Sequence, residues 1–125
     1  MAPTYNLGSC EECCPSCEYS VIVRIEKYNN GNNVAMVAVN EIGGGIYLYS
    51  VAYPSQITDP GGFFSGTLMN GATIVYSANS IVIGVPQNLG GPKTITFPNP
   101  TISEGTFQSG KYWEAYSESC QISEE

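Results

Sequence analysis

Apolar and polar residues alternate along most of this chain with the two-residue period of half-buried β-strands. In residues 20–28, the apolar residues fall on one face and the charged residues Arg24 and Glu26 fall on the other. Comparable runs follow at residues 34–39, 46–53, 64–69, 72–77, 80–85, 93–97, 101–107 and 111–117. Turn signals separate them roughly every 8–12 residues, and no helical period lasts longer than one turn. The pattern predicts an all-β domain, an antiparallel sandwich or barrel of about eight short strands.

Turn-forming residues lie between these runs. Asn30–Gly31 and Asn70–Gly71 predict hairpins, because asparagine and glycine accept the positive φ of tight turns. Gly43–Gly45 predicts a hairpin tip or a β-bulge, since it lacks the lysine and the helix of a phosphate-binding loop. Residues 54–62 form the longest predicted loop. Residues 80–85 are apolar almost throughout, which predicts a strand that is buried on both faces or at an interface.

The 125 residues divide into three predicted parts. Residues 1–17 predict an extended, cysteine-rich N-terminal arm, residues 18–117 a single β-sandwich domain, and residues 118–125 an acidic C-terminal tail. A domain of this length is large enough to bury a hydrophobic core. The first residues lack the basic region and the apolar stretch of a secretory signal, so we expect none, and no apolar run is long enough to span a membrane.

The cysteines are the first candidate site. Four lie within the arm and one lies in the tail: Cys10, Cys13, Cys14, Cys17 and Cys120. A bridge from the cluster to Cys120 would close a loop of nearly the whole domain, worth roughly 4–5 kcal/mol on chain-entropy grounds. Because the count is odd, one cysteine must be free, bound to a metal or paired with another chain.

A metal is the second interpretation of the cluster. The two CxxC units offer four thiolates, Cys10, Cys13, Cys14 and Cys17, which suit a structural zinc ion. The units adjoin each other, however, whereas zinc ribbons separate theirs by a dozen or more residues. Neighbouring glutamates disfavour a reactive thiolate. Disulfides, structural zinc and reduced thiols therefore all stay open, and we expect no other cofactor.

The charge pattern argues against nucleic acid and for protein or neutral partners. Only 12% of the residues are charged, the net charge is −7, and there are four cations: Arg24, Lys27, Lys93 and Lys111. Such a chain has no electrostatic footprint for DNA or RNA. Most glutamates lie near the two ends, so the middle is almost uncharged. This distribution is typical of a surface that packs against other subunits or binds neutral ligands.

No catalytic set is recognisable in the sequence. The chain has no histidine, which excludes Ser-His-Asp and Cys-His arrangements. Asp59 is followed by Pro-Gly-Gly and is expected in a turn, and Glu41 and Glu104 are expected on turns or strand faces. We therefore predict a protein that is not an enzyme.

Tyrosines are the second candidate site. Tyr47, Tyr49 and Tyr53 share one face of a predicted strand, and Tyr112 and Tyr116 share one face of the last strand. On an exposed face such rings would stack on sugars or anchor a protein interface. The alternative is that they lie on the core side or beneath a neighbouring loop.

These features together resemble the small virion proteins of tailed bacteriophages, which are leaderless β-domains rich in Gly, Asn and Tyr with N-terminal arms. The resemblance is to capsid cement (decoration) proteins or, alternatively, to tail or baseplate components. It implies a structural protein that forms a homo-oligomer, with a trimer favoured, and that binds a larger scaffold such as a major capsid protein. It would be made in the host cytoplasm and lie on the virion surface, with the Cys10–Cys17 arm anchoring a contact.

A second class of function stays open. An extracellular carbohydrate-binding or adhesin-like β-sandwich would use the same exposed tyrosines together with the abundant asparagines. An isolated monomer that binds a glycan would indicate this class, whereas a stable oligomer without such a ligand would indicate the assembly protein.

Overall fold

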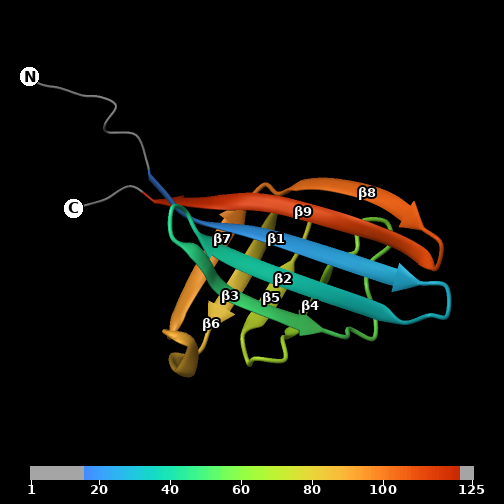
Figure 1. Ribbon diagram of the computed structural model, residues 1–125, viewed down its shortest axis with the longest axis horizontal. Coiled ribbons are helices and arrows are strands. Elements are labelled where there is room, and N and C mark those ends of the chain that lie inside the picture. Colours follow the sequence, from blue (N-terminus) through green and yellow to red (C-terminus); the bar gives the residue numbers. More distant parts are fainter. Residues whose placement is uncertain (1–15, 122–125) are drawn as a thin grey trace, which may run out of the picture.

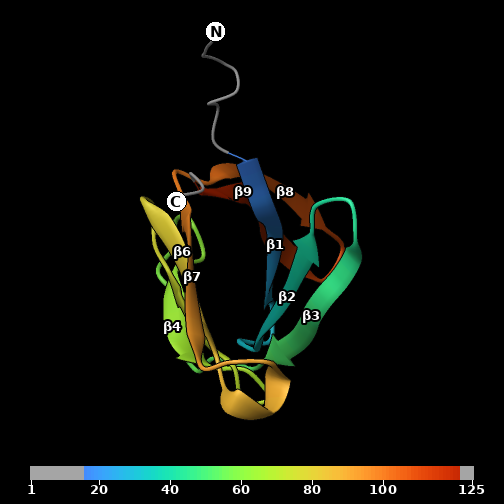
Figure 2. The same ribbon diagram turned by 90° about the vertical axis from the view of Figure 1, so that its left-hand side faces the viewer.

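The computed structural model describes residues 16–121 and contains two antiparallel β-sheets packed face to face (Figures 1 and 2). The five-stranded sheet has the order β3-β2-β1-β9-β8, and the four-stranded sheet has the order β4-β5-β6-β7. The strands are β1 (Ser16–Tyr28), β2 (Asn33–Glu41), β3 (Gly45–Ala52), β4 (Phe64–Thr67), β5 (Thr73–Tyr76), β6 (Ser80–Val85), β7 (Lys93–Pro98), β8 (Thr101–Phe107) and β9 (Gly110–Gln121). The predicted all-β sandwich is confirmed, with nine strands in the described part of the chain.

The first and last strands pair with each other in the middle of the five-stranded sheet. Strand β1 is antiparallel to β9 over its whole length, from Ser16 opposite Gln121 to Tyr28 opposite Gly110. On its other side β1 forms a hairpin with β2. Because β1 begins at Ser16 and β9 ends at Gln121, the strands reach beyond the expected domain of residues 18–117 at both ends. The remainder of the predicted arm and tail, residues 1–15 and 122–125, lies outside the described residues.

The core lies between the sheets and is built from alternate residues of nearly every strand. The inner face of β1 contributes Val21, Val23 and Ile25, all fully buried, and Trp113 of β9 is also buried. From the opposite sheet come Ile74, Ile81, Ile83, Ile95 and Phe97. Fully burying a side chain of this kind contributes about 1.5–3 kcal/mol. Successive residues of each strand alternate between this core and the outer surface, which explains the alternation of apolar and polar residues in the sequence.

The structure differs from the sequence-based expectation at two places. Strand β6 was expected to be buried on both faces or at an interface; within one chain only its inner residues Ile81, Ile83 and Val85 are buried, while Val82 is partly exposed on the outer face. Tyr47 was expected on the same face as Tyr49, which would place Ile46 on the opposite face with Leu48. The strands β2 and β3 contain a register shift, in which Val39 pairs with Leu48 and Asn40 pairs with Ile46. Tyr47 is the extra residue of this bulge, and Ile46 is left 75% exposed.

The long loop after β3 is tied to the five-stranded sheet at one end of the sandwich. Asp59 accepts a hydrogen bond from Lys27 Nζ at 3.0 Å and lies 3.6 Å from Lys111 Nζ. Gly62 has a φ of 76°, and a Cβ at this position would lie 2.8 Å from Cε3 of Trp113. Only glycine satisfies both conditions, because a side chain would be strained at this φ and would collide with the ring. The loop therefore closes over the core at Trp113.

Candidate functional site

The outer face of the five-stranded sheet is the side that points away from the four-stranded sheet, and a row of apolar side chains crosses it. The strand register places Tyr49 beside Ala38, Ala38 beside Ile22, and Ile22 beside Tyr116. These four residues are called the apolar row below. Tyr49 is 56% exposed, and Ile22 and Tyr116 are each 43% exposed. No described element of the chain lies over the row, as the edge-on view of the sheets shows (Figure 2).

A charged cluster lies next to the apolar row on the same face. Arg24 Nε donates to Glu26 at 2.8 Å, and Arg24 Nη1 donates to Glu114 at 2.9 Å. The guanidinium carbon also lies 4.1 Å from the centre of the Tyr112 ring. The Tyr28 hydroxyl donates to Glu26 at 2.7 Å, and this bond, followed by the one from Arg24, lowers the pKa of Glu26. The cluster is therefore held by its own contacts and leaves Arg24 paired with carboxylates of its own sheet.

The structure separates the predicted tyrosines into two groups. Tyr49, Tyr53 and Tyr116 are exposed, with Tyr53 at 66% immediately after the end of β3. Tyr112 is partly buried beneath the Arg24 guanidinium. Tyr47 differs from the rest because it is the extra residue of the bulge. The exposed rings are available to a partner, whereas Tyr47 and Tyr112 are engaged by their own chain.

Tyr47 packs at the sandwich edge instead of joining the exposed stripe. Its ring centre lies 5.2 Å from that of Tyr19, and Lys93 Nζ from the opposite sheet lies 5.2 Å from the Tyr47 ring. The Lys93 ammonium also donates to the Tyr19 hydroxyl at 3.3 Å. These three residues link the two sheets through a cation–π cluster. Tyr47 is therefore partly buried and held by its own chain, apart from the exposed tyrosines of the sheet face.

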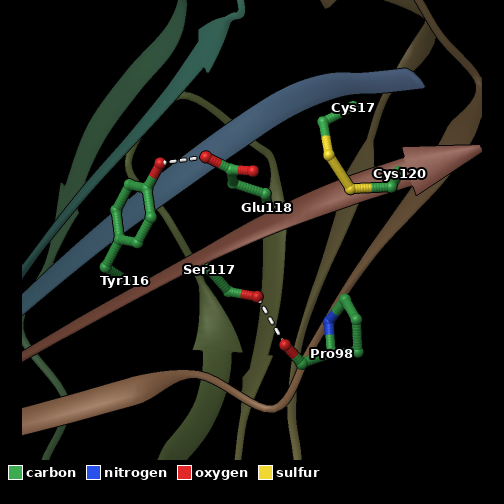
Figure 3. The surroundings of a disulfide bond; sticks show 6 residues. All are labelled: Cys17, Pro98, Tyr116, Ser117, Glu118 and Cys120. Atoms are coloured by element: carbon green, nitrogen blue, oxygen red, sulfur yellow. Dashed lines mark hydrogen bonds between the residues drawn. A yellow bond between two sulfur atoms is a disulfide. The ribbon is translucent and has the colours of Figure 1, made fainter. Parts of the chain in front are cut away.

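The cysteines form one disulfide within the described residues, between Cys17 and Cys120 (Figure 3). The two cysteines are direct cross-strand neighbours in β1 and β9. Figure 3 shows Tyr116 and Glu118 bonded to each other on one side of β9, while the Ser117 hydroxyl donates to the Pro98 carbonyl on the other. The bridge thus fastens the first strand to the last at the end of the sandwich where the described chain begins and ends (Figure 1).

The predicted four-thiolate zinc set falls mostly outside the described residues, because Cys10, Cys13 and Cys14 all lie there. Among the described residues, Cys17, Cys120 and Glu118 bring their ligand atoms within 4.8 Å of one another. The two sulfur atoms are bonded to each other, however, and a disulfide offers no thiolate to a metal. Structural zinc in the arm stays a prediction.

The carboxylates considered as catalytic candidates are scattered. Glu104 on the edge strand β8 accepts a hydrogen bond from Trp113 Nε1 at 3.2 Å. Glu41 lies exposed at the end of β2, and Asp59 is paired with lysines. Sequence analysis missed Ile22 and Ala38 as members of the exposed face, although their alternation with Val21 and Val37 already placed them opposite the core.

Comparison with known proteins adds no assignment: no family model matches the chain, and neither the curated proteins nor the solved structures give a match. Within the described part of the chain, no helix has the length and hydropathy needed to cross a membrane. The functional argument therefore rests on the geometry of this β-sandwich.

Proposed function

We propose that this chain is a non-enzymatic structural protein that assembles through the outer face of its five-stranded sheet. The observation that carries the proposal is the apolar row formed by Tyr49, Ala38, Ile22 and Tyr116, over which no element of residues 16–121 lies. Contiguous exposed apolar surface on a folded domain marks a binding surface, whereas single exposed apolar residues do not. The occupant that we propose for this face is a second copy of the chain.

The size of the face supports this occupant. Five strands about 4.8 Å apart and four side-chain rows about 6.8 Å apart give roughly 650 Å². A standard interface buries about 800 Å² per partner, with a spread of about 200 Å². The outer face alone is thus large enough for a specific contact, and no refolding of the sandwich is needed to expose it.

The order of residues along the row supports pairing with an identical face. A two-fold axis parallel to the strands, midway between β1 and β2, reverses the row of the second copy. Ala38 then lies over Ile22, so that a small side chain meets a large one, and Tyr49 lies over Tyr116. Aromatic pairs of this kind add about 0.5–1.5 kcal/mol beyond their buried area.

The charged cluster is compatible with the same arrangement. In the neighbouring row, the register runs from Val51 through Met36 and Arg24 to Glu114. Reversal by the same axis sets Arg24 over Met36 and Glu114 over Val51, so like charges do not face each other. Because Arg24 and Glu114 are already paired within one copy, the interface would not leave either charge unpaired.

The wider role follows from the resemblance to capsid cement proteins. On this proposal the assembled domain binds a larger protein scaffold, such as a capsid shell, and lies on the virion surface. Two faces that pack on each other give a two-fold dimer, and the trimer that the resemblance favours needs a second contact surface as well. The number of copies is therefore a direct measurement to make on the intact protein.

Sedimentation velocity and native mass spectrometry would test the proposal, with the wild type and each variant carrying Cys10→Ser/Cys13→Ser/Cys14→Ser, because this background keeps the Cys17–Cys120 bridge and removes the cysteines that could link two chains. We expect a discrete oligomer for the wild-type chain and a monomer for Ile22→Lys, which places a charge in the middle of the row. The matched control is Val75→Lys, since Val75 is 51% exposed on the outer face of the other sheet.

The control variant should keep the wild-type oligomer, and circular dichroism should show that both variants are folded. A wild-type chain that is monomeric at high micromolar concentration would overturn the proposal. So would an oligomer that survives Ile22→Lys unchanged, because its contacts would then lie elsewhere.

A further inference from the structure

The turn between β1 and β2 lies at the end of the sandwich opposite the end where the described chain begins and ends (Figure 1). A hollow of about 690 Å³ lies beside this turn. The turn between β1 and β2 forms one wall, and the chain that follows β3 forms the other. Its lining residues are Tyr28, Asn30, Gly31, Asn32, Asn33, Val34, Tyr53, Pro54 and Ser55. The volume lies within the range of about 300–1,000 Å³ that is usual for small-molecule sites.

A second hollow of about 550 Å³ adjoins the first. The two share Tyr53, Pro54 and Ser55, and the second continues along residues 56–58 and 63–67. Tyr53 lines both hollows and is 66% exposed. Two hollows that share one exposed tyrosine suit an elongated ligand that extends from one hollow into the other.

Internal hydrogen bonds hold both walls of the first hollow. Tyr28 N donates to Asn32 O at 2.8 Å, and Asn32 N donates to Asn30 Oδ1 at 3.0 Å. The side chain of Asn33 is buried, and its Nδ2 donates to Pro54 O at 3.1 Å, which joins the turn to the opposite wall. A site fixed before the ligand arrives loses less conformational entropy on binding.

The chemistry of the lining is uncharged throughout, although the chain has a net charge of −7. No residue of either hollow is Asp, Glu, Lys or Arg. Asn32 and Ser55 are exposed, and within the described residues their side chains make no hydrogen bond. Together with the Tyr53 ring they offer amide donors, amide and hydroxyl acceptors, and an apolar surface.

We propose that these two hollows form a binding site for a neutral oligosaccharide, with Tyr53 as the platform for a sugar ring. Sugars combine an apolar ring face with many hydroxyl groups, and the lining offers an aromatic face beside amides and hydroxyls. An anionic ligand would find no cation in the lining. A quaternary ammonium ion would use the rings but not the amide donors.

The lining contains no member of the apolar row, and the site adjoins the same sheet face at its loop end, where Tyr28 and Val34 belong to the first hollow. It narrows the sequence-based alternative, which placed sugar contacts on the stripe of Tyr47, Tyr49 and Tyr53, to Tyr53. Tyr47 packs at the sandwich edge, and Tyr49 lies on the sheet face outside both hollows.

Saturation-transfer NMR and titration calorimetry on the full chain would test the proposal. The probes are neutral hexasaccharides of β-glucan, α-glucan, xylan, mannan and chitin, with tetramethylammonium and a polyuronate hexamer as charged comparisons. We expect at least one neutral hexasaccharide to bind at millimolar concentration or below, and to bind more tightly than its monosaccharide. Tyr53→Ala should weaken that binding roughly ten-fold, the loss of one stacked ring.

The control is Val75→Ala, which removes an exposed apolar side chain outside both hollows and outside the apolar row and should leave glycan affinity unchanged. Tyr53→Phe should retain most of the affinity, because it keeps the ring. The proposal is overturned if no neutral hexasaccharide binds, if only a charged probe binds, or if Val75→Ala weakens binding as much as Tyr53→Ala. Loss of self-association in Ile22→Lys with glycan binding retained would separate the two sites.

Discussion

Removing the Cys17–Cys120 bridge should destabilise this domain more than most single changes in its surface. The bridge joins residues 103 positions apart, so it closes a loop of nearly the whole sandwich. For a loop of about 100 residues, the entropy lost by the unfolded chain corresponds to about 4.7 kcal/mol at 25 °C. With an unfolding entropy of about 2.1 cal/mol/K per residue, that loss lowers the melting temperature by roughly 18 °C.

A background without the other cysteines makes the measurement specific. In Cys10→Ser/Cys13→Ser/Cys14→Ser only the two bridged cysteines remain, and the effect of reductant then belongs to one bond. Urea unfolding followed by the fluorescence of Trp113, the single tryptophan, gives the free energy of unfolding with and without reductant. We expect reduction to lower the free energy of unfolding by about 4.7 kcal/mol. The fluorescence baseline of the folded state should change little.

Two results would refute the reasoning. A loss below about 1 kcal/mol would mean that closing the long loop does not restrain the unfolded chain as assumed. Two reactive thiols in the oxidised triple variant would mean that Cys17 and Cys120 are not bonded to each other. The double variant Cys17→Ser/Cys120→Ser in the otherwise natural chain should reproduce the reduced form.

Three further changes test the packing and the charges. Gly62→Ala should lower the free energy of unfolding in urea by about 1–3 kcal/mol, because the new Cβ would collide with Trp113 at a residue of positive φ. Gly31→Ala is the control and should lower it by less, because Gly31 also has a positive φ but no atom lies near the new Cβ. The hydrogen bond from Lys27 lowers the pKa of Asp59. The ionised carboxylate therefore stabilises the folded state above about pH 4, and this stabilisation is lost as pH falls through the lowered pKa. Asp59→Asn should therefore show a weaker loss of stability in acid-unfolding curves than the wild type. Burial raises the pKa of Tyr76 to about 12. Between about pH 10 and this value the unfolded chain loses the tyrosine proton while the folded chain keeps it, so the stability of the fold should decrease. In thermal scans over this range, Tyr76→Phe should show a smaller decrease than the wild type.

The strands were predictable because their alternation is local information. The predicted runs and the nine strands agree closely, and the turns at Asn30–Gly31 and Asn70–Gly71 join paired strands as expected. The pairing of β1 with β9 joins the two ends of the described chain, and no local pattern specifies it. The bulge that displaces Tyr47 was also missed, since one inserted residue changes the face of its neighbours without changing the apolar pattern.

The candidate sites were predictable only in part for the same reason. Tyr49 and Tyr116 were recognised as candidates from their positions in single strands. Their place in one row with Ile22 and Ala38 depends on the register of four strands, which the sequence does not specify. The hollow beside Tyr53 requires a loop to fold against a distant turn, through the bond from Asn33 to Pro54. Sites of this kind become visible only when non-local contacts are known.

The two proposed sites have a geometric consequence when taken together. A two-fold axis parallel to the strands keeps the loop ends of both copies at the same end of the dimer, so both Tyr53 platforms would face one surface. Two linked sites bind a surface that carries many glycans far more tightly than one site does, without any new contact. Ile22→Lys should therefore lose most of the binding to glycan-coated surfaces in surface plasmon resonance while its affinity for the soluble hexasaccharide stays the same. Equal retention of wild type and Ile22→Lys on the coated surface would contradict this arrangement of the dimer.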